Sequence, residues 1–278
     1  MCNKDDHAII LTPCYQSLYE IPASNCGKVD AIPLEENNNW RIEISKIENA
    51  IQHNTKCIVI NFPHNPTGQV ISETEMSALV ELRRKYDIWL FSDEVYRFLG
   101  TPQYGWAASA VDCYEKGISL GVMSKAFGMP GLRVGWIACQ DKEMLEQFKQ
   151  YKDYLSICNS APSELLTEIA LSNSAKVLEI NNQLVTKNFN QLQQFMEKHN
   201  KLFSWVIPNG GCIGFIRLLA DTKVKKICHD LVEKKGVLLL PANVYELQSN
   251  HFRIGYGRKN FSEALGIFEQ FIHENFNF

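Results

Sequence analysis

The chain has 278 residues, of which 45% are hydrophobic and 21% charged, a composition typical of one large globular domain or two smaller ones. Its formal net charge of −3 argues against a nucleic-acid partner, because proteins that bind nucleic acids usually have a basic surface. No apolar run approaches the length of a membrane-spanning helix, and the acidic start lacks the apolar core of a signal peptide, so we expect a soluble, cytoplasmic protein with no membrane partner.

The first half of the chain alternates short apolar runs with helical patterns. Runs rich in β-branched residues predict strands at 7–11, 29–34, 56–61, 88–94, 117–122 and 133–139. Several runs are continuously apolar, as in strands that are buried on both faces of a parallel sheet. Between them, residues 72–86 predict a helix, with Ser72 and Glu75 spaced as a capping box. This order predicts an α/β fold with a mostly parallel central sheet flanked by helices.

After about residue 141 the pattern changes to longer helices and shorter strands. Helices are predicted at 141–156, 163–172, 175–200, 222–235 and 260–275, and strands near 203–207, 213–218, 237–240 and 252–256. We therefore predict a large domain over residues 1–178 and a small α+β C-terminal domain over residues 179–278, joined by the long helix.

Cysteine and histidine spacing gives no support for a metal centre. The nine cysteines are scattered, odd in number and without a C-x-x-C pair, which predicts buried, reduced thiols rather than disulfides or a zinc cluster. The seven histidines contain no H-E-x-x-H or comparable spacing. We therefore expect no metal ion.

Three motifs come directly after predicted strands. They are NFPHNPTG at 61–68, SDEVY at 92–96 and MSKAFGMPGLRVGW at 123–136. Taken singly, the first is an ordinary turn and the second an ordinary helix cap. The third brings Lys125 into a glycine-rich turn, where a lysine can serve as a nucleophile. Because ligands bind at the carboxyl ends of the strands in α/β sheets, the three motifs together predict one site.

In this order the motifs resemble those of the class I and II aminotransferases, the fold-type-I enzymes that use pyridoxal 5′-phosphate. The resemblance extends from DHAIILTPCYQSL to FRIGYGR, which is nearly the whole chain. It implies the large and small domains of that family and a homodimer. It also implies an enzyme that moves an amino group between an amino acid and a 2-keto acid.

The resemblance assigns cofactor-binding roles to residues of the three motifs. Lys125 would be the catalytic residue and would form the Schiff base with the cofactor's aldehyde. Asp93 would pair with the protonated pyridine nitrogen and keep the ring an electron sink. Tyr96 and Asn65 would hydrogen-bond the phenolic oxygen, and Arg133 would bind the phosphate.

Further roles come from the same resemblance. Tyr15 matches the aromatic residue that stacks on the pyridine ring. Ser124 would contribute to phosphate binding, since the position of the usual phosphate-binding hydroxyl is Val122 here. Arg253 would bind the α-carboxylate of the substrate through its guanidinium fork, together with Asn65. The resemblance also predicts a cis Asn65–Pro66 peptide bond.

The resemblance begins part of the way into the family's large domain. The N-terminal arm, the first strand and the loop whose backbone N–H groups bind the cofactor phosphate have no counterpart in this sequence, so we expect impaired activity. Two alternatives stay open: an inactive or weakly cofactor-binding remnant, and a pyridoxal-phosphate-dependent lyase or cyclase on the same fold. The side chain of the substrate is not predicted.

Overall fold

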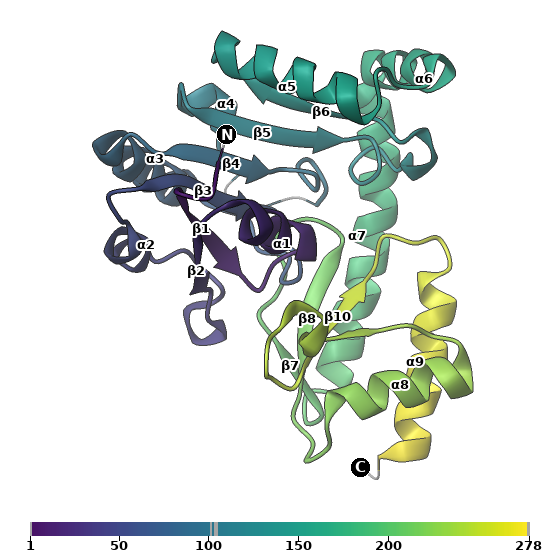
Figure 1. Ribbon diagram of the computed structural model, residues 1–278. Coiled ribbons are helices and arrows are strands. Elements are labelled where there is room, and N and C mark those ends of the chain that lie inside the picture. The colour runs from purple at the N-terminus through teal and green to yellow at the C-terminus, as the bar shows by residue number, and fades with distance from the viewer. Residues whose placement is uncertain (1, 101, 103–104, 277–278) are drawn as a thin grey trace.

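The computed structural model describes residues 2–100, 102 and 105–276, which form two sheets with their helices (Figure 1). The strands of the larger sheet are β1 (His7–Thr12), β2 (Lys28–Pro33), β3 (Thr55–Asn61), β4 (Trp89–Asp93), β5 (Gly117–Val122) and β6 (Gly135–Cys139). Their order in space is β2-β1-β3-β4-β5-β6.

The first five strands of this sheet are parallel, and β6 pairs antiparallel with β5. The predicted mostly parallel sheet is thus confirmed. Because the chain goes from β1 outward to β2 and then returns to place β3 on the other side of β1, the strand order reverses at β1 and β3. A reversal of this kind opens a crevice at the carboxyl ends of the strands, where α/β proteins bind their ligands.

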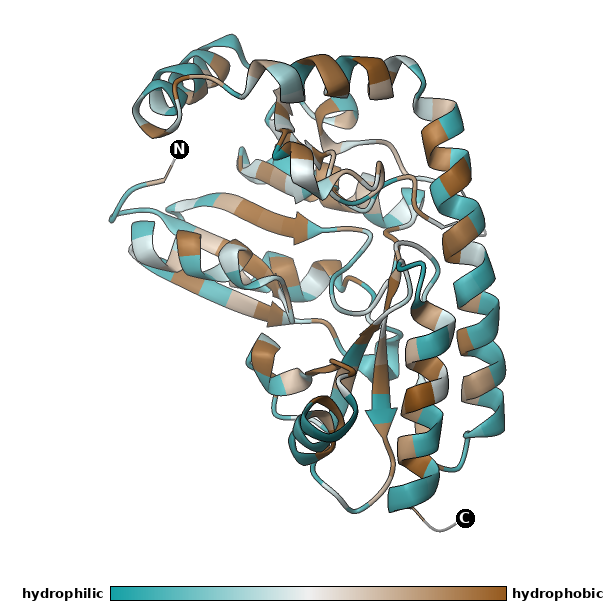
Figure 2. Ribbon diagram, turned by 90° about the vertical axis from the view of Figure 1, so that its right-hand side faces the viewer, coloured by the Kyte–Doolittle hydropathy of each residue, from teal (hydrophilic) through white to brown (hydrophobic). Residues whose placement is uncertain are grey.

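Helices cover both faces of the larger sheet. They are α1 (Gln16–Asn25), η1 (Glu36–Asn38), α2 (Ile44–Ala50), α3 (Glu73–Tyr86), α4 (Ala110–Cys113), η2 (Pro130–Leu132) and α5 (Lys142–Leu155). Ile9, Ile58 and Leu90 share one core with side chains from α2 and α3, whereas Ile10 and Val59 share another with side chains from α1 and α5. Burial on both faces explains the continuously apolar runs, and these strands are brown in Figure 2.

The smaller sheet comes after α6 (Ala161–Ser172) and the long α7 (Ser174–Lys198), which runs from the larger sheet to the smaller one (Figure 1). Its elements are β7 (Phe203–Trp205), β8 (Ile213–Leu218), α8 (Val224–Lys235), β9 (Leu240–Pro241), η3 (Ala242–Tyr245), β10 (His251–Gly255) and α9 (Phe261–Asn275). The strands pair antiparallel in the order β7-β8-β10-β9. Their core is continuous with Met123 and Ala126, which lie on either side of Lys125 in the chain.

Local expectations are met at α3. The hydroxyl of Ser72 accepts a hydrogen bond from the backbone N–H of Glu75 at 3.2 Å, and the carboxylate of Glu75 accepts one from the N–H of Ser72 at 2.8 Å. The predicted capping box is therefore confirmed, and it fixes the start of α3.

Some expectations need correction. The strand expected at 133–139 begins at Gly135, because Arg133 takes a left-handed conformation (φ 55°) that ends η2. Within the expected strand 237–240, only Leu240 pairs with β10. All nine cysteines are free, as expected, but the expected burial holds only for Cys14, Cys57, Cys139 and Cys228, since Cys158 is exposed and the other four are half-buried. No helix in the described part of the chain is both long and apolar enough to cross a bilayer.

Candidate active site

Three neighbouring strands carry the three motifs. Strands β3 and β4 end level with one another, and β5 continues two residues further, to Val122. In the sheet register Asn61 lies opposite Asp93, and Asp93 lies opposite Leu120. The loops that leave β3, β4 and β5 therefore start from the same edge of the larger sheet, as the parallel arrangement predicts.

The loop after β3 is tied to β4 by the side chain of Asn61. Its Oδ1 accepts a hydrogen bond from the N–H of Asn65 at 2.9 Å, while its Nδ2 donates to the carbonyl of Asp93 at 2.9 Å. The Asn65–Pro66 peptide bond is cis, as expected. These contacts hold the backbone of Asn65 close to the end of β4. They leave the side-chain amide of Asn65 available for other partners.

The same loop is also tied to the smaller sheet, through Gly68. Its carbonyl accepts hydrogen bonds from the N–H groups of Asn209 and Gly210, each at 3.0 Å. Gly68 has φ +72°, and a Cβ there would lie 2.3 Å from the carbonyl oxygen of Ile213, so only glycine fits. The NPTG loop thus joins the two parts of the molecule at the site.

Asp93 is an acid held in an apolar setting. Its side chain is only 6% exposed, and its carboxylate accepts a hydrogen bond from the N–H of Val95 at 3.1 Å. Burial raises the pKa of Asp93 to about 6, against the opposing effects of that N–H and of the charge on Lys125. A cation placed against this carboxylate would restore its ionised form.

The next residue, Glu94, fixes the position of the motif through three hydrogen bonds. Its carboxylate accepts hydrogen bonds from the hydroxyls of Ser109 (2.6 Å) and Ser119 (3.0 Å) and from the N–H of Ala110 (3.0 Å). These partners come from α4 and β5 and from the residue before α4, so Glu94 fixes the end of β4 against its neighbours. This positioning role has no signature in the sequence.

Lys125 lies in the turn after β5, on a rigid backbone. Its carbonyl accepts a hydrogen bond from the N–H of Gly128 at 3.0 Å, and the side chain of Asn181 on α7 donates to the carbonyl of Ala126 at 2.9 Å. The side chain of Lys125 is exposed, and its Nζ lies 5.5 Å from the ring centroid of Tyr96. A ligand can therefore reach the amine while the backbone stays fixed.

Arg253 reaches the site from β10 of the smaller sheet. Its Nη1 donates to Oδ1 of Asn65 at 3.0 Å, and the hydroxyl of Tyr245 donates to the same oxygen at 3.3 Å. The guanidinium carbon of Arg253 lies 5.9 Å from the ring centroid of Tyr245. The structure thus brings together Lys125, Asp93, Tyr96, Asn65 and Arg253, which we call the strand-edge cluster.

Cys212 and Tyr245 also lie close to the strand-edge cluster, although no sequence motif predicts them. Burial raises the pKa of the Cys212 thiol to about 11, although Lys125 and Arg253 lie close enough to act in the opposite direction. Tyr245 lies at the end of η3, and burial raises its pKa to about 12. Neither residue belongs to a motif. Only the close approach of the smaller sheet reveals them.

Within the described part of the chain, the side chains of the remaining predicted residues form no hydrogen bond to the strand-edge cluster. Arg133 is exposed and its Nη1 donates to the carbonyl of Pro130 at 3.2 Å. Ser124 is half-buried, and its hydroxyl has no hydrogen bond within the described residues. Tyr15 is 55% exposed at the start of α1, close enough to Tyr245 to contribute to its raised pKa.

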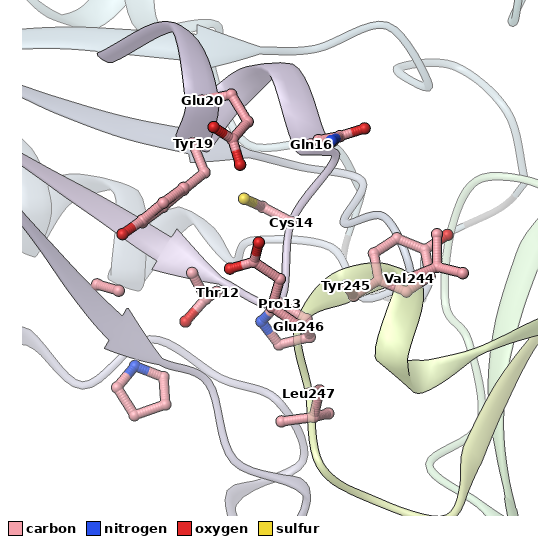
Figure 3. A pocket seen from close by; sticks show the side chains of 12 residues that line it. Thr12, Pro13, Cys14, Gln16, Tyr19, Glu20, Val244, Tyr245, Glu246 and Leu247 are labelled. Carbon is pink, nitrogen blue, oxygen red and sulfur yellow. The ribbon is translucent and has the colours of Figure 1, made fainter. Parts of the chain in front are cut away.

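A cavity of about 200 Å³ lies beside the strand-edge cluster rather than over Lys125. One wall comes from α1, with Gln16, Tyr19 and Glu20, and the other from residues 244–247 (Figure 3). Tyr245 lines this cavity and also contacts Asn65, so it lies between the cavity and the strand-edge cluster.

The donor set of the strand-edge cluster fits pyridoxal 5′-phosphate. Lys125 offers an accessible amine for an aldehyde, and the buried Asp93 offers a carboxylate for a pyridinium nitrogen. Asn65 uses Oδ1 twice, while its Nδ2 and the hydroxyl of Tyr96 have no hydrogen bond to another described residue. Both are therefore donors for a phenolic oxygen.

Comparisons with known proteins agree with this fit. Residues 1–264 match the family model for aminotransferase class I and II. The chain is 26% identical over 251 residues to the capreomycidine synthase of Streptomyces vinaceus, which covers 90% of this chain and 64% of that protein. It is 24% identical over 278 residues to the aspartate aminotransferase of Thermotoga maritima, covering 98% of this chain and 71% of that protein.

A solved structure supports the same relationship. The crystal structure of a PLP-dependent aminotransferase from Streptococcus suis superposes with a TM-score of 0.93 at 31% identity, covering 100% of this chain and 73% of that one. The chain therefore spans about two thirds to three quarters of the length of these similar proteins.

Proposed function

The chain belongs to the class I and II aminotransferase family, whose members use pyridoxal 5′-phosphate, and we propose that it moves an amino group between an amino acid and a 2-keto acid. The observation that carries the proposal is the strand-edge cluster. A nucleophilic amine, a buried carboxylate and an amide meet there from the carboxyl ends of three neighbouring strands and the loops that follow them, together with an arginine from the other sheet.

We propose that the predicted residues hold the cofactor at its four functional groups. Lys125 binds its aldehyde carbon, Asp93 its pyridine nitrogen, and Tyr96 and Asn65 its phenolic oxygen. Ser124 and Arg133 bind the phosphate, and Tyr15 lies against the ring. Pyridoxal 5′-phosphate, when bound, supplies an electron sink that stabilises negative charge at the Cα of the amino acid.

Side chains of the protein would bind the substrate and transfer its proton. The guanidinium of Arg253, held by Oδ1 of Asn65, binds the α-carboxylate of the substrate through two N–H groups and so fixes the orientation of Cα. The amine of Lys125 then takes the proton from Cα as a general base and delivers one as a general acid. Its exposed position in a rigid turn allows this movement.

We also propose that the protein is a homodimer. Large apolar side chains are exposed on α5 and in the segment from α5 to α6, including Tyr154 (92%), Leu155 (70%), Ile157 (75%) and Leu165 (59%). A surface of this kind on a water-soluble chain is typical of an interface. Sedimentation velocity would show a two-chain species if the proposal is right and a monomer alone if it is wrong.

The activity is tested by product formation from paired substrates. The cofactor-loaded protein is mixed with a panel of amino acids and either pyruvate or 2-oxoglutarate, and the new amino acid is measured by chromatography. We expect a product that requires both donor and acceptor, and a loss of at least about 100-fold in Lys125→Ala. Lys176→Ala, on the exposed side of α7, is the matched control.

Two outcomes would contradict transamination. Equal activity in Lys125→Ala would remove the lysine from the reaction. A product that forms without any keto-acid acceptor would favour a lyase or cyclase, a second candidate that the structural similarity to a PLP-dependent cyclase keeps open.

A further inference from the structure

A cluster of metal-ligand side chains lies far from the strand-edge cluster, where α7 and α9 run side by side (Figures 1 and 2). His199 caps the C-terminus of α7, while Glu269 and His273 lie one turn apart on α9. Asn181 contacts the Lys125 turn, so the eighteen residues from Asn181 to His199 place this cluster about 27 Å further along α7.

The three side chains converge on one point. The Nε2 atom of His199 lies 2.8 Å from Oε1 of Glu269, and the rings of His199 and His273 are 5.7 Å apart between centroids. One nitrogen or oxygen from each residue lies within 4.8 Å of the other two. His199 is buried, Glu269 is half-buried and His273 is exposed, so the cluster opens to solvent on one side.

We propose that His199, Glu269 and His273 bind a zinc ion. Two imidazoles and one carboxylate form a donor set that zinc accepts, with bonds of about 2.0–2.2 Å and water in the fourth position. Donors around one such ion lie roughly 3.4 Å apart in a tetrahedron, between the shortest and the longest spacings seen here. Rotation of the exposed His273 side chain would close the remaining distance.

Binding would replace existing contacts. The hydrogen bond between Nε2 of His199 and Oε1 of Glu269 is lost when both atoms become ligands, because the nitrogen can bind the ion only without a proton. Lys198 also lies 2.9 Å from Oε1 of Glu269 and would have to move away. Its side chain is 61% exposed, and a surface ion pair of this kind contributes little that would oppose a metal.

Spacing in the chain does not predict this site, because seventy residues separate His199 from Glu269. The ligands come from the end of one helix and the side of another, so zinc would clamp α7 to α9. At a zinc concentration about 100 times the dissociation constant, the melting temperature should rise by roughly 5–10 °C.

The test uses the full chain without an affinity tag, loaded with pyridoxal 5′-phosphate. After dialysis against buffered zinc, the metal content per chain is measured by mass spectrometry, and its ligands are identified by X-ray absorption. The variants are Glu269→Gln and His273→Ala. The control is His229→Ala, since His229 is also exposed and lies beside an acid on α8.

The proposal predicts one zinc ion per chain with nitrogen and oxygen ligands. Affinity should fall at least 10-fold in Glu269→Gln and in His273→Ala and stay unchanged in His229→Ala. Melting curves without zinc verify that each variant folds, and replacing the exposed His273 should not prevent folding. No bound zinc, sulfur ligands, or equal zinc content in all variants would overturn the proposal.

Discussion

Asp93 illustrates how a site residue can oppose the stability of the chain that carries it. Its folded-state pKa of about 6 exceeds the ordinary value of 3.8 because the carboxylate is buried. The folded chain therefore binds this proton more tightly than the unfolded chain does. The stabilising effect is full below about pH 4 and is lost as the pH rises through 6.

Asp93→Asn should therefore change the pH dependence of folding in the cofactor-free chain. Asparagine keeps the hydrogen bond from Val95 but does not ionise, so the variant should be more stable at pH 7 by roughly 2–3 kcal/mol and nearly equal to the parent at pH 4. Urea unfolding at both pH values measures the difference.

The matched control for this experiment is Asp153→Asn, on the exposed side of α5, which should change stability little at either pH. If Asp93→Asn gave the same free energy difference from the parent at pH 4 and pH 7, burial would not be what raises the pKa of Asp93. The variant should also bind pyridoxal 5′-phosphate more weakly, because a neutral amide cannot pair with a pyridinium ion.

At the scale of elements, the site depends on how η3 and β10 meet the loop after β3. Tyr245 and Arg253 come from these two elements, and both donate to Oδ1 of Asn65. That oxygen therefore links the larger sheet to the arginine proposed for the substrate. The hydroxyl of Tyr245 acts through Asn65 and Arg253, so Tyr245 is a positioning residue.

Tyr245→Phe removes only this hydroxyl. We expect the KM for the amino acid to rise by roughly 2–10-fold, the range for one lost hydrogen bond, with kcat nearly unchanged because the arginine still binds the carboxylate. Steady-state kinetics with a saturating acceptor measures both constants.

Tyr19→Phe is the control for Tyr245→Phe, since Tyr19 lines the same cavity from α1. An equal rise in KM in both variants would mean that the cavity wall matters rather than the bond to Asn65. A large fall in kcat at constant KM would contradict the positioning role of Tyr245.

The sequence predicts most elements well, and the exceptions have physical causes. The strands of the larger sheet are found from apolar runs because both faces are buried, and α3 from its capping box. Helix α1 gives a weak signal because it contains Pro22 and buries only Leu18. Arg133 shows the limit at a boundary, since a left-handed residue ends η2 within what reads as one apolar strand.

For the site, sequence motifs predict the residues that lie directly after the strands. They do not predict which residues are brought close by the packing of elements that are distant in the chain. Asn65, Asp93 and Lys125 can be predicted as site residues because each lies at or just beyond the end of a strand of one parallel sheet. Cys212 and Tyr245 come to the site only because the smaller sheet packs against the NPTG loop. The same reason hides His199 and Glu269, which are brought together by the packing of two helices.

Considered as a whole, the molecule places the residues of the strand-edge cluster at the junction of two sheets. Asp93 and Lys125 belong to the larger sheet and Arg253 to the smaller one, while α7 and the NPTG loop hold the two together. This arrangement would let one sheet hold a cofactor while the other holds the carboxylate of a substrate. The central claim is therefore that Lys125 is where the cofactor attaches.

That claim is tested most directly by borohydride reduction of the purified chain with pyridoxal 5′-phosphate, and then by digestion and mass spectrometry of the peptides. We predict one stable cofactor adduct, located on Lys125, absent in Lys125→Ala and present in Lys176→Ala. Adducts spread over several surface lysines, or an unchanged adduct yield in Lys125→Ala, would contradict the assignment of this cluster as the cofactor site.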